Sequence, residues 1–260
     1  MELRTKKEHG FEYVEEGDGP VLLLLHGLFG ALSNWQAVLR FFSSRYKVVI
    51  PLMPIYEMPL KNTNVGGLTD FIHSFINYKG YEQVTLLGNS LGGHVGLTYT
   101  IEHPEKVSAL VLTGSSGLYE NSMGGSFPQR NNYDFIRSKV EYTFYDPRTA
   151  TKDLVDEVYE TVNNRSRGMR IIAMAKSSIR HNLKTEIQGI QVPVCLIWGA
   201  NDNITPAYVA EEFHKLIPAS ELHFIDQCGH AAMMEKPEEF NQVLQPFLEN
   251  VIPQPNPQNA

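Results

Sequence analysis

Two serines of this chain stand in nearly the same short pattern, and a serine in such a pattern can act as a nucleophile. Ser90 lies in LLGNSLGGHVG and Ser122 lies in YENSMGGSF. An apolar run and Gly88 precede Ser90, and a stretch typical of a helix follows it. A serine at the apex of a tight strand-to-helix turn needs small residues two places before and two places after it, because the backbone is strained and the helix passes close to the strand. Gly88 and Gly92 meet this requirement, so Ser90 is our candidate nucleophile.

Ser122 lacks these surroundings. Glu120 stands where the first small residue is needed, and no apolar run leads into the pattern. The stretch Gly-Gly-Ser-Phe-Pro follows soon after and is typical of a loop. We therefore expect no chemistry at Ser122.

A serine nucleophile needs a histidine base and an acid that holds the histidine in the right tautomer. Among the nine histidines, His230 follows LHFIDQCG and is expected in a loop at the carboxyl end of a strand. Asp202 lies in VCLIWGANDNITP, in a similar loop before the next predicted helix. Glu57 and Asp226 are the alternatives for the acid. His26 ends an apolar run, and we expect it to support its loop rather than to transfer protons.

A developing oxyanion needs hydrogen-bond donors, which two backbone amides can provide. The N–H of Leu91 follows the candidate nucleophile at the start of a helix, whose dipole favours negative charge. The N–H of Leu28 lies in LLHGLFGALSNW, where Gly27 lets the chain turn toward Ser90. The expected substrate-binding residues are sequence neighbours of this machinery, namely Asn89, Gly27, Phe29 and Ala231.

Length and composition are those of an ordinary globular protein. The chain has 260 residues, of which 42% are hydrophobic and 20% charged, and this suits one large domain. The net charge of −7 argues against a nucleic-acid-binding surface. No apolar run approaches the roughly 18 residues of a membrane span, and the start MELRTKKEHG lacks the apolar core of a secretory signal. We expect a cytoplasmic protein that acts on a small molecule and binds neither nucleic acid nor membrane, while its oligomeric state stays open.

The chain has two cysteines, Cys195 and Cys228, both in or beside apolar runs. We interpret them as buried free thiols in a reducing compartment. Neither an H-E-x-x-H motif nor paired C-x-x-C motifs occur in the sequence. The sequence therefore predicts no metal site and no cofactor.

Apolar runs alternate with helical patterns along the chain, which predicts a mostly parallel sheet with helices on both faces. A turn at Glu16–Pro20 between the first two runs indicates an edge hairpin. The stripe Leu68, Phe71, Ile72, Phe75 and Ile76 indicates an amphipathic helix. The expected strands are Phe11–Val14, Val21–Leu25, Val48–Ile50, Val84–Leu87, Ala109–Leu112, Val194–Trp198 and Leu222–Ile225.

The alternation stops between residues 118 and 185, where the sequence favours helices at Tyr133–Tyr142, Thr151–Asn163 and Ser166–His181. A helical insertion over the carboxyl ends of parallel strands would cover the place where such sheets bind ligands. We expect a core at 1–117 and 186–250, a helical cap at 118–185 and a flexible, proline-rich tail at 251–260. Candidates for the inner side of the cap, or for packing within it, are Met169, Ile172, Met174 and Ile179.

Four motifs, HGLFG, GNSLGG, WGANDNITP and CGHAAMMEKPEEF, stand in the order found in the α/β-hydrolase superfamily, which the chain resembles from about Phe11 to Asn250. The resemblance implies the α/β-hydrolase fold under a helical cap. It also implies roles for five residues: nucleophile Ser90, acid Asp202, base His230, and oxyanion-hole amides Leu28 and Leu91.

Within the superfamily, GNSLGG and SELHFIDQCGH look most like hydrolases that cleave carbon–carbon bonds in ring-fission products of aromatic compounds. Those enzymes typically carry a Trp directly after the catalytic histidine, where this chain has Ala231. The segment VVIPLMPIYEMPL also lacks the D-x-x-G-x-G loop of many relatives. Within this segment, Tyr56 and Glu57 are the candidates to face the expected substrate-binding cleft.

These observations favour a serine hydrolase without metal or cofactor that cleaves a carboxylic ester of a small to medium, partly apolar substrate through an acyl-enzyme. A carbon–carbon bond hydrolase is the alternative among enzymes. A ligand receptor with the same fold and slow turnover is the alternative outside them. Epoxide and haloalkane hydrolases are disfavoured, because they would carry Asp at the position of Ser90.

Overall fold

The computed structural model describes residues 4–30, 35–119 and 129–252. The strands are β1 (Thr5–Glu8), β2 (Phe11–Glu16), β3 (Val21–Leu25), β4 (Lys47–Pro51), β5 (Val84–Asn89), β6 (Val107–Thr113), β7 (Val194–Gly199) and β8 (Ser220–Ile225). The α-helices are α1 (Gln36–Phe42), α2 (Val65–Lys79), α3 (Leu91–Glu102), α4 (Tyr133–Glu141), α5 (Lys152–Asn163), α6 (Arg165–Arg180), α7 (Ala207–Leu216), α8 (Ala232–Glu235) and α9 (Pro237–Val251). The short 3₁₀ helices are η2 (Leu60–Asn62), η3 (Pro104–Lys106), η4 (Pro147–Thr149) and η5 (Glu186–Gly189).

The strands form one eight-stranded sheet in the order β1-β2-β4-β3-β5-β6-β7-β8. All neighbours from β4 to β8 pair in parallel, whereas β1 and β2 are antiparallel. Parallel strands need crossover helices, which cover both faces of the sheet and bury the strands on both sides. The predicted mostly parallel α/β fold is therefore confirmed.

Alternate residues of the central strands enter two separate hydrophobic clusters. Leu22 and Leu24 of β3 pack with α1 and α9 on one face, and Leu23 and Leu25 pack with α2, α3 and α7 on the other. Side chains of a strand point alternately to its two faces, so an all-apolar strand must be covered on both. The predicted stripe from Leu68 to Ile76 lies on the buried face of α2.

The edge hairpin differs from the prediction. Strand β2 does not pair with β3, because β4 lies between them and pairs with both. The hairpin is formed by β1 and β2 around His9 and Gly10, which both have positive φ angles, of 49° and 84°. This pair of conformations is the one that two-residue hairpin turns favour. Strand β1 was missed because its sequence, TKKE, contains no apolar run.

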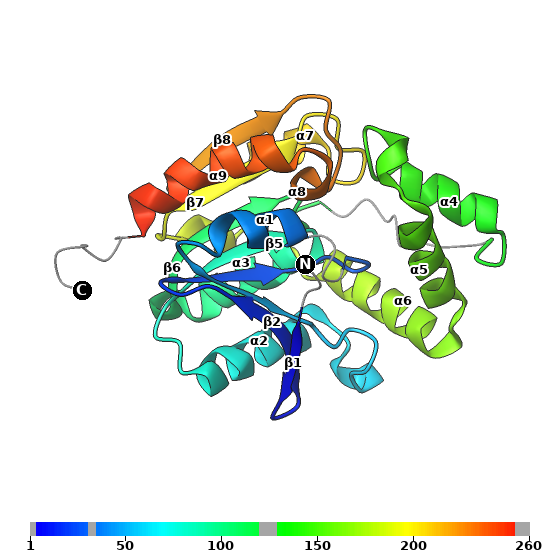
Figure 1. Cartoon of the computed structure of the whole chain (residues 1–260), viewed down its shortest axis with the longest axis horizontal. Coiled ribbons are helices and arrows are strands. Elements are labelled where there is room, and N and C mark those ends of the chain that lie inside the picture. The colour runs from blue at the N-terminus through cyan, green and yellow to red at the C-terminus, as the bar shows by residue number, and fades with distance from the viewer. Residues whose placement is uncertain (1–3, 31–34, 120–128, 253–260) are drawn as a thin grey trace.

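The chain segment that joins β6 to β7 contains helices α4, α5 and α6. These three helices lie together at one end of the sheet (Figure 1). Their bounds agree with the three predicted helices to within one residue at each end. Thr151 caps α5, since its side chain accepts a hydrogen bond from the N–H of Leu154. Ser122 and residues 253–260 of the predicted tail lie outside the described residues. The prediction that the tail begins at Val251 was wrong, since Val251 is the last residue of α9 and Ile252 is buried. No helix in the described ranges combines the length and the apolar character needed to cross a bilayer.

The turn from β5 into α3 depends on glycines that let the helix approach the sheet. Ser90 stands at its apex with a φ of 54°, a conformation that costs a non-glycine residue about 1–3 kcal/mol. A Cβ added at Gly92 would lie 2.0 Å from the carbonyl oxygen of Leu25, and one at Gly88 would lie 2.5 Å from the carbonyl oxygen of Gly92. Any side chain at these two positions would push α3 away from β3 or β5. The turn predicted from the sequence is therefore present.

We predict that Gly92→Ala destabilises the protein, because the new methyl group would meet the backbone of a central strand that cannot move aside. The expected loss of unfolding free energy in a urea titration is about 1–3 kcal/mol or more. Gly189→Ala is the matched control, since nothing lies within 4 Å of a Cβ added there. Equal stability of the two variants would contradict the proposed close packing.

Candidate active site

His230 and Asp202 form a buried pair at the carboxyl ends of the sheet. His230 Nδ1 lies 2.9 Å from Asp202 Oδ2, and both side chains are almost fully buried. An ionised carboxylate only accepts hydrogen bonds, so Nδ1 carries the proton and Nε2 is left as the basic nitrogen. This arrangement holds the imidazole in one tautomer and one orientation.

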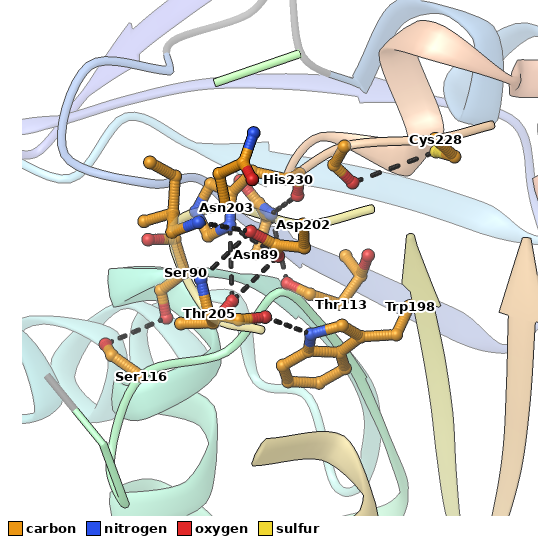
Figure 2. A network of polar contacts seen from close by, with 12 residues as sticks. Asn89, Ser90, Thr113, Ser116, Trp198, Asp202, Asn203, Thr205, Cys228 and His230 are labelled. Atoms are coloured by element: carbon orange, nitrogen blue, oxygen red, sulfur yellow. Dashed lines mark hydrogen bonds and ion pairs between the residues drawn. The ribbon is translucent and has the colours of Figure 1, made fainter. Parts of the chain in front are cut away.

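Thr205 completes the surroundings of the carboxylate. Oδ1 of Asp202 accepts the N–H groups of Ile204 and Thr205 at 2.7 and 2.9 Å, and the Thr205 hydroxyl donates to Oδ2 at 2.8 Å. A buried carboxylate is stable only when such donors replace its water. The Thr205 carbonyl in turn accepts the indole N–H of Trp198 from β7 (Figure 2). Sequence reasoning missed Thr205, although the NDNIT pattern offers a hydroxyl three residues after the acid.

Ser90 and His230 line the same cavity. Within the described chain, no hydrogen bond joins their side chains, and the backbone carbonyl of Ser90 accepts one from the Ser116 hydroxyl at 3.2 Å (Figure 2). Hydrogen bonds between a nucleophile and its base are often long without substrate and shorten when substrate binds. The structure thus brings together the three residues singled out in the sequence, with Asp202 behind His230 and Ser90 in front.

The loop after β3 forms the wall opposite Ser90. A Cβ added at Gly27 would lie 3.4 Å from Ser90 Cβ, so the loop passes directly beside the serine. Leu28 and Leu91 both line the cavity. Leu91 is the first residue of α3, and its N–H therefore has no partner within the helix. Both residues therefore border the cavity beside Ser90.

His26 and the proline-containing segment after β4 support this loop. His26 Nε2 accepts the N–H of Met53 at 3.0 Å, and its Nδ1 therefore donates to the carbonyl of Gly27 at 2.8 Å. Burial lowers the pKa of His26, so the ring is neutral and serves as a fixed support. The Tyr56 hydroxyl donates to the Leu28 carbonyl at 2.5 Å. Glu57, the other candidate of this segment, is exposed and does not line the cavity.

Asn89 directs its amide nitrogen at backbone carbonyls. Nδ2 donates to Thr113 at 3.0 Å and to His230 at 3.3 Å, and the residue is buried at the edge of the cavity. Both amide protons are used in these contacts. Asn89 therefore fixes the loop that carries His230, and only its Oδ1 is left for a substrate.

Helices α4, α5 and α6 supply the outer half of the cavity. The residues expected at the substrate, Gly27, Phe29, Asn89 and Ala231, all line it. Met174 and Ile179 of α6 also line it, although Ile179 is 48% exposed. Met169 and Ile172 are exposed and do not line it, so neither the inner side nor packing within the cap holds for those two. They lie on the face of α6 opposite the buried Ile171 and Met174. The remaining lining from these helices and the turn after α4 is Lys139, Val140, Thr143, Phe144, Leu154, Val158, Ala175 and Ser178.

Neither His94, four residues after Ser90, nor Cys228 lines the cavity. His94 stacks on His181 of the α6 terminus at a ring separation of 5.2 Å, and burial lowers its pKa to about 3. Cys228 is buried, and burial raises the pKa of its thiol to about 12, so it stays protonated near neutral pH. The prediction that both cysteines are buried free thiols is confirmed.

Glu235 joins the His230 loop to the segment that follows α4. One carboxylate oxygen accepts the N–H of Gly229 at 2.6 Å, and the other accepts the N–H of Asp146 at 2.5 Å. The N–H of His230 donates to the carbonyl of Thr143 at 2.9 Å. The position of the imidazole therefore depends on Asp202, which follows β7, and on the segment that follows α4.

Residues 20–237 match the family described as alpha/beta hydrolase fold. The chain is 30% identical to 2-hydroxy-6-oxo-6-(2'-aminophenyl)hexa-2,4-dienoic acid hydrolase of Metapseudomonas resinovorans, over 91% of this chain and 86% of the relative. It is 26% identical to a monoacylglycerol lipase of Bos taurus, over 96% of this chain and 83% of the relative. Among solved structures, an alpha/beta hydrolase enzyme from the metagenome of lagoon sediments at Mar Chica, Morocco, is 44% identical with a TM-score of 0.80, over 95% of this chain and 98% of that one.

We predict that Glu235→Ala lowers kcat for p-nitrophenyl acetate by roughly 10- to 100-fold, because losing the carboxylate releases the loop that orients His230. Glu239→Ala is the matched control, since that carboxylate lies in the first turn of α9 and is mostly exposed. Steady-state kinetics of the two variants checks this. Unchanged kcat in Glu235→Ala would show that the loop keeps its position without the carboxylate.

Proposed function

The chain belongs to the α/β-hydrolase family, and on that premise we propose that it is a serine hydrolase that cleaves carboxylic esters of small to medium, partly apolar molecules. One observation carries the proposal: Ser90 and His230 line one apolar cavity, and His230 is backed there by a buried carboxylate. Helices α4, α5 and α6 are proposed to act as its cap, within residues 118–185.

The geometry supports an acyl-transfer mechanism. Ser90 Oγ attacks the ester carbonyl while Nε2 of His230 takes the serine proton, and Asp202 stabilises the imidazolium that forms. The N–H groups of Leu28 and Leu91 hold the oxyanion. The imidazolium then protonates the leaving alcohol, and an acyl-enzyme remains. Water, activated by the same Nε2, releases the acid and restores the serine.

Cavity size and lining support the proposed substrate class. The cavity holds about 190 Å³, less than the roughly 300–1,000 Å³ of pockets that bind drug-sized ligands. Most of its lining side chains are apolar, and its polar lining residues include Asn89, Ser90, Ser116 and His230 from the core. Such a pocket favours an apolar acyl or alcohol group attached to one polar, reacting centre.

A carbon–carbon bond hydrolase is the second candidate, favoured by the likeness to the dienoic acid hydrolase. Such a reaction needs a cation for the substrate carboxylate. Arg167, Arg170 and Arg180 do not line the cavity, and Arg170 is occupied with the carbonyl of Met58 at 2.8 Å. Among the described residues, Lys139 is the one Lys or Arg that lines the cavity; it lies on the exposed side of α4, with its ammonium group 5.6 Å from the centre of the Phe135 ring.

We predict that a fluorophosphonate probe labels Ser90, and that Ser90→Ala abolishes both labelling and ester turnover. Asp202→Asn should keep the fold and lower kcat by roughly 10⁴-fold, since the amide holds the wrong tautomer of His230. Ser122→Ala and Asp226→Asn are the matched controls and should stay active. Labelling at Ser122, or a single turnover followed by a stable adduct, would contradict the proposed enzyme, and the latter would favour a receptor.

We further predict that p-nitrophenyl butyrate is hydrolysed with a kcat/KM at least roughly tenfold above that of a ring-fission dienoate, a difference of about 1.4 kcal/mol in transition-state binding. Lys139→Met should leave ester cleavage nearly unchanged. Lys176→Met, on the exposed face of α6 and away from the cavity, is its control. A faster reaction with the dienoate, lost in Lys139→Met only, would replace the esterase proposal with the carbon–carbon hydrolase.

A further inference from the structure

Three side chains with metal-binding atoms meet on strands β7 and β8, away from the cavity. Cys195 of β7 pairs in register with Glu221 of β8, and His223 follows two residues later on the same strand. Residues in register on neighbouring strands, and residues two apart on one strand, point to the same face of a sheet. The thiol, one carboxylate oxygen and one imidazole nitrogen all lie within 4.8 Å of one another.

The contacts within this group link all three residues. The Cys195 thiol lies within 4.8 Å of one oxygen of the Glu221 carboxylate. Glu221 Oε1 lies 3.1 Å from His223 Nε2. A thiol in an apolar core needs no polar neighbour, yet this one faces a carboxylate that an imidazole also contacts. The group therefore differs from a simple buried cysteine beside a surface ion pair.

Access from solvent is one-sided. Strand β8 is the edge of the sheet, and the side chains of Glu221 and His223 are 50% and 41% exposed, whereas Cys195 is fully buried. An incoming ion would meet the carboxylate and imidazole first and the sulfur last. Water can fill a fourth position on the open side.

We propose that Cys195, Glu221 and His223 form a binding site for a thiophilic divalent cation, for which Zn²⁺ is the natural candidate. Sulfur, nitrogen and carboxylate oxygen are the ligands that Zn²⁺ takes in tetrahedral sites, and the thiol loses its proton when the metal binds. Ligand atoms on one zinc ion lie roughly 3.5 Å apart, given bonds of about 2.0–2.3 Å. The exposed carboxylate and imidazole can close the remaining distance by rotating toward the sulfur.

The position of the site in the sheet indicates its role. Cys195 and Glu221 are each the second residue of their strands, so the site lies toward the amino ends, whereas Ser90 and His230 lie at the carboxyl ends. A metal here would join the edge strand to its neighbour. The proposal therefore concerns the stability of the folded chain and does not depend on the proposed function.

The test uses the full chain after treatment with a chelator. Binding of Zn²⁺ is measured by calorimetry and by thermal unfolding. Binding of Cd²⁺ is measured by its thiolate charge-transfer absorption. We expect that one ion binds per chain, that Tm rises with metal concentration, and that a thiolate absorption band appears. Cys195→Ala should abolish the band and the Tm rise. His223→Ala, which changes an exposed side chain, should weaken binding at least tenfold even if Cys195→Ala folds poorly.

Two matched controls assign the site. Cys228→Ala removes the other buried thiol, and His214→Ala removes a histidine on the exposed side of α7. Both should bind as the unmodified chain does. The proposal is overturned if the unmodified chain shows no thiolate band, if the band persists in Cys195→Ala, or if His223→Ala and His214→Ala weaken binding equally.

Discussion

The close approach of α3 to the sheet is the constraint on which the site depends. Gly92 brings the first turn of the helix against the carbonyl of Leu25, and Gly88 leaves room for that turn behind β5. This packing forces Ser90 into its positive φ and presents its side chain at the top of the sheet. The same approach brings the start of α3 beside the loop that follows β3, since a Cβ added at Gly92 would lie 2.8 Å from the carbonyl oxygen of His26. The position of Ser90 thus depends on the lack of side chains at Gly88 and Gly92, which lets α3 pack against the sheet.

His230 is held in a different way, by hydrogen bonds to its ring and to its backbone. Asp202 fixes the ring, Asn89 holds the backbone carbonyl of His230, and Thr143 accepts its N–H. Gly114 passes so near the ring that a Cβ there would lie 2.8 Å from Nδ1. Because these contacts come from the core and from the segment after α4, the loop is fixed only when both parts are folded. Several individually weak contacts together hold the imidazole in one orientation although it lies on a loop.

Local sequence patterns predicted most of the fold because each central strand is buried on both faces and reads as an apolar run. The turn at Ser90 and the roles considered for Asp202 and His230 also follow from short motifs with glycine and from strand ends. Strand β1 escaped detection because an edge strand with a polar sequence has no such pattern. The outward position of Met169 and Ile172 was missed because it depends on which face of α6 meets the core. Thr205, Glu235 and the group around Cys195 depend on contacts between distant segments, which no local pattern encodes.

The bonds between the His230 loop and the segment after α4 have a consequence for divergence. The acceptor at Thr143 is a backbone carbonyl, and the donor at Asp146 is a backbone N–H. Neither depends on which side chain occupies its position, provided that the main chain follows the same path. Cavity-lining positions such as Val140, Leu154 and Val158 can therefore be exchanged through mutation and selection without loosening the imidazole. The lining of the cavity can therefore change on these helices while Ser90, Asp202 and His230 keep their geometry.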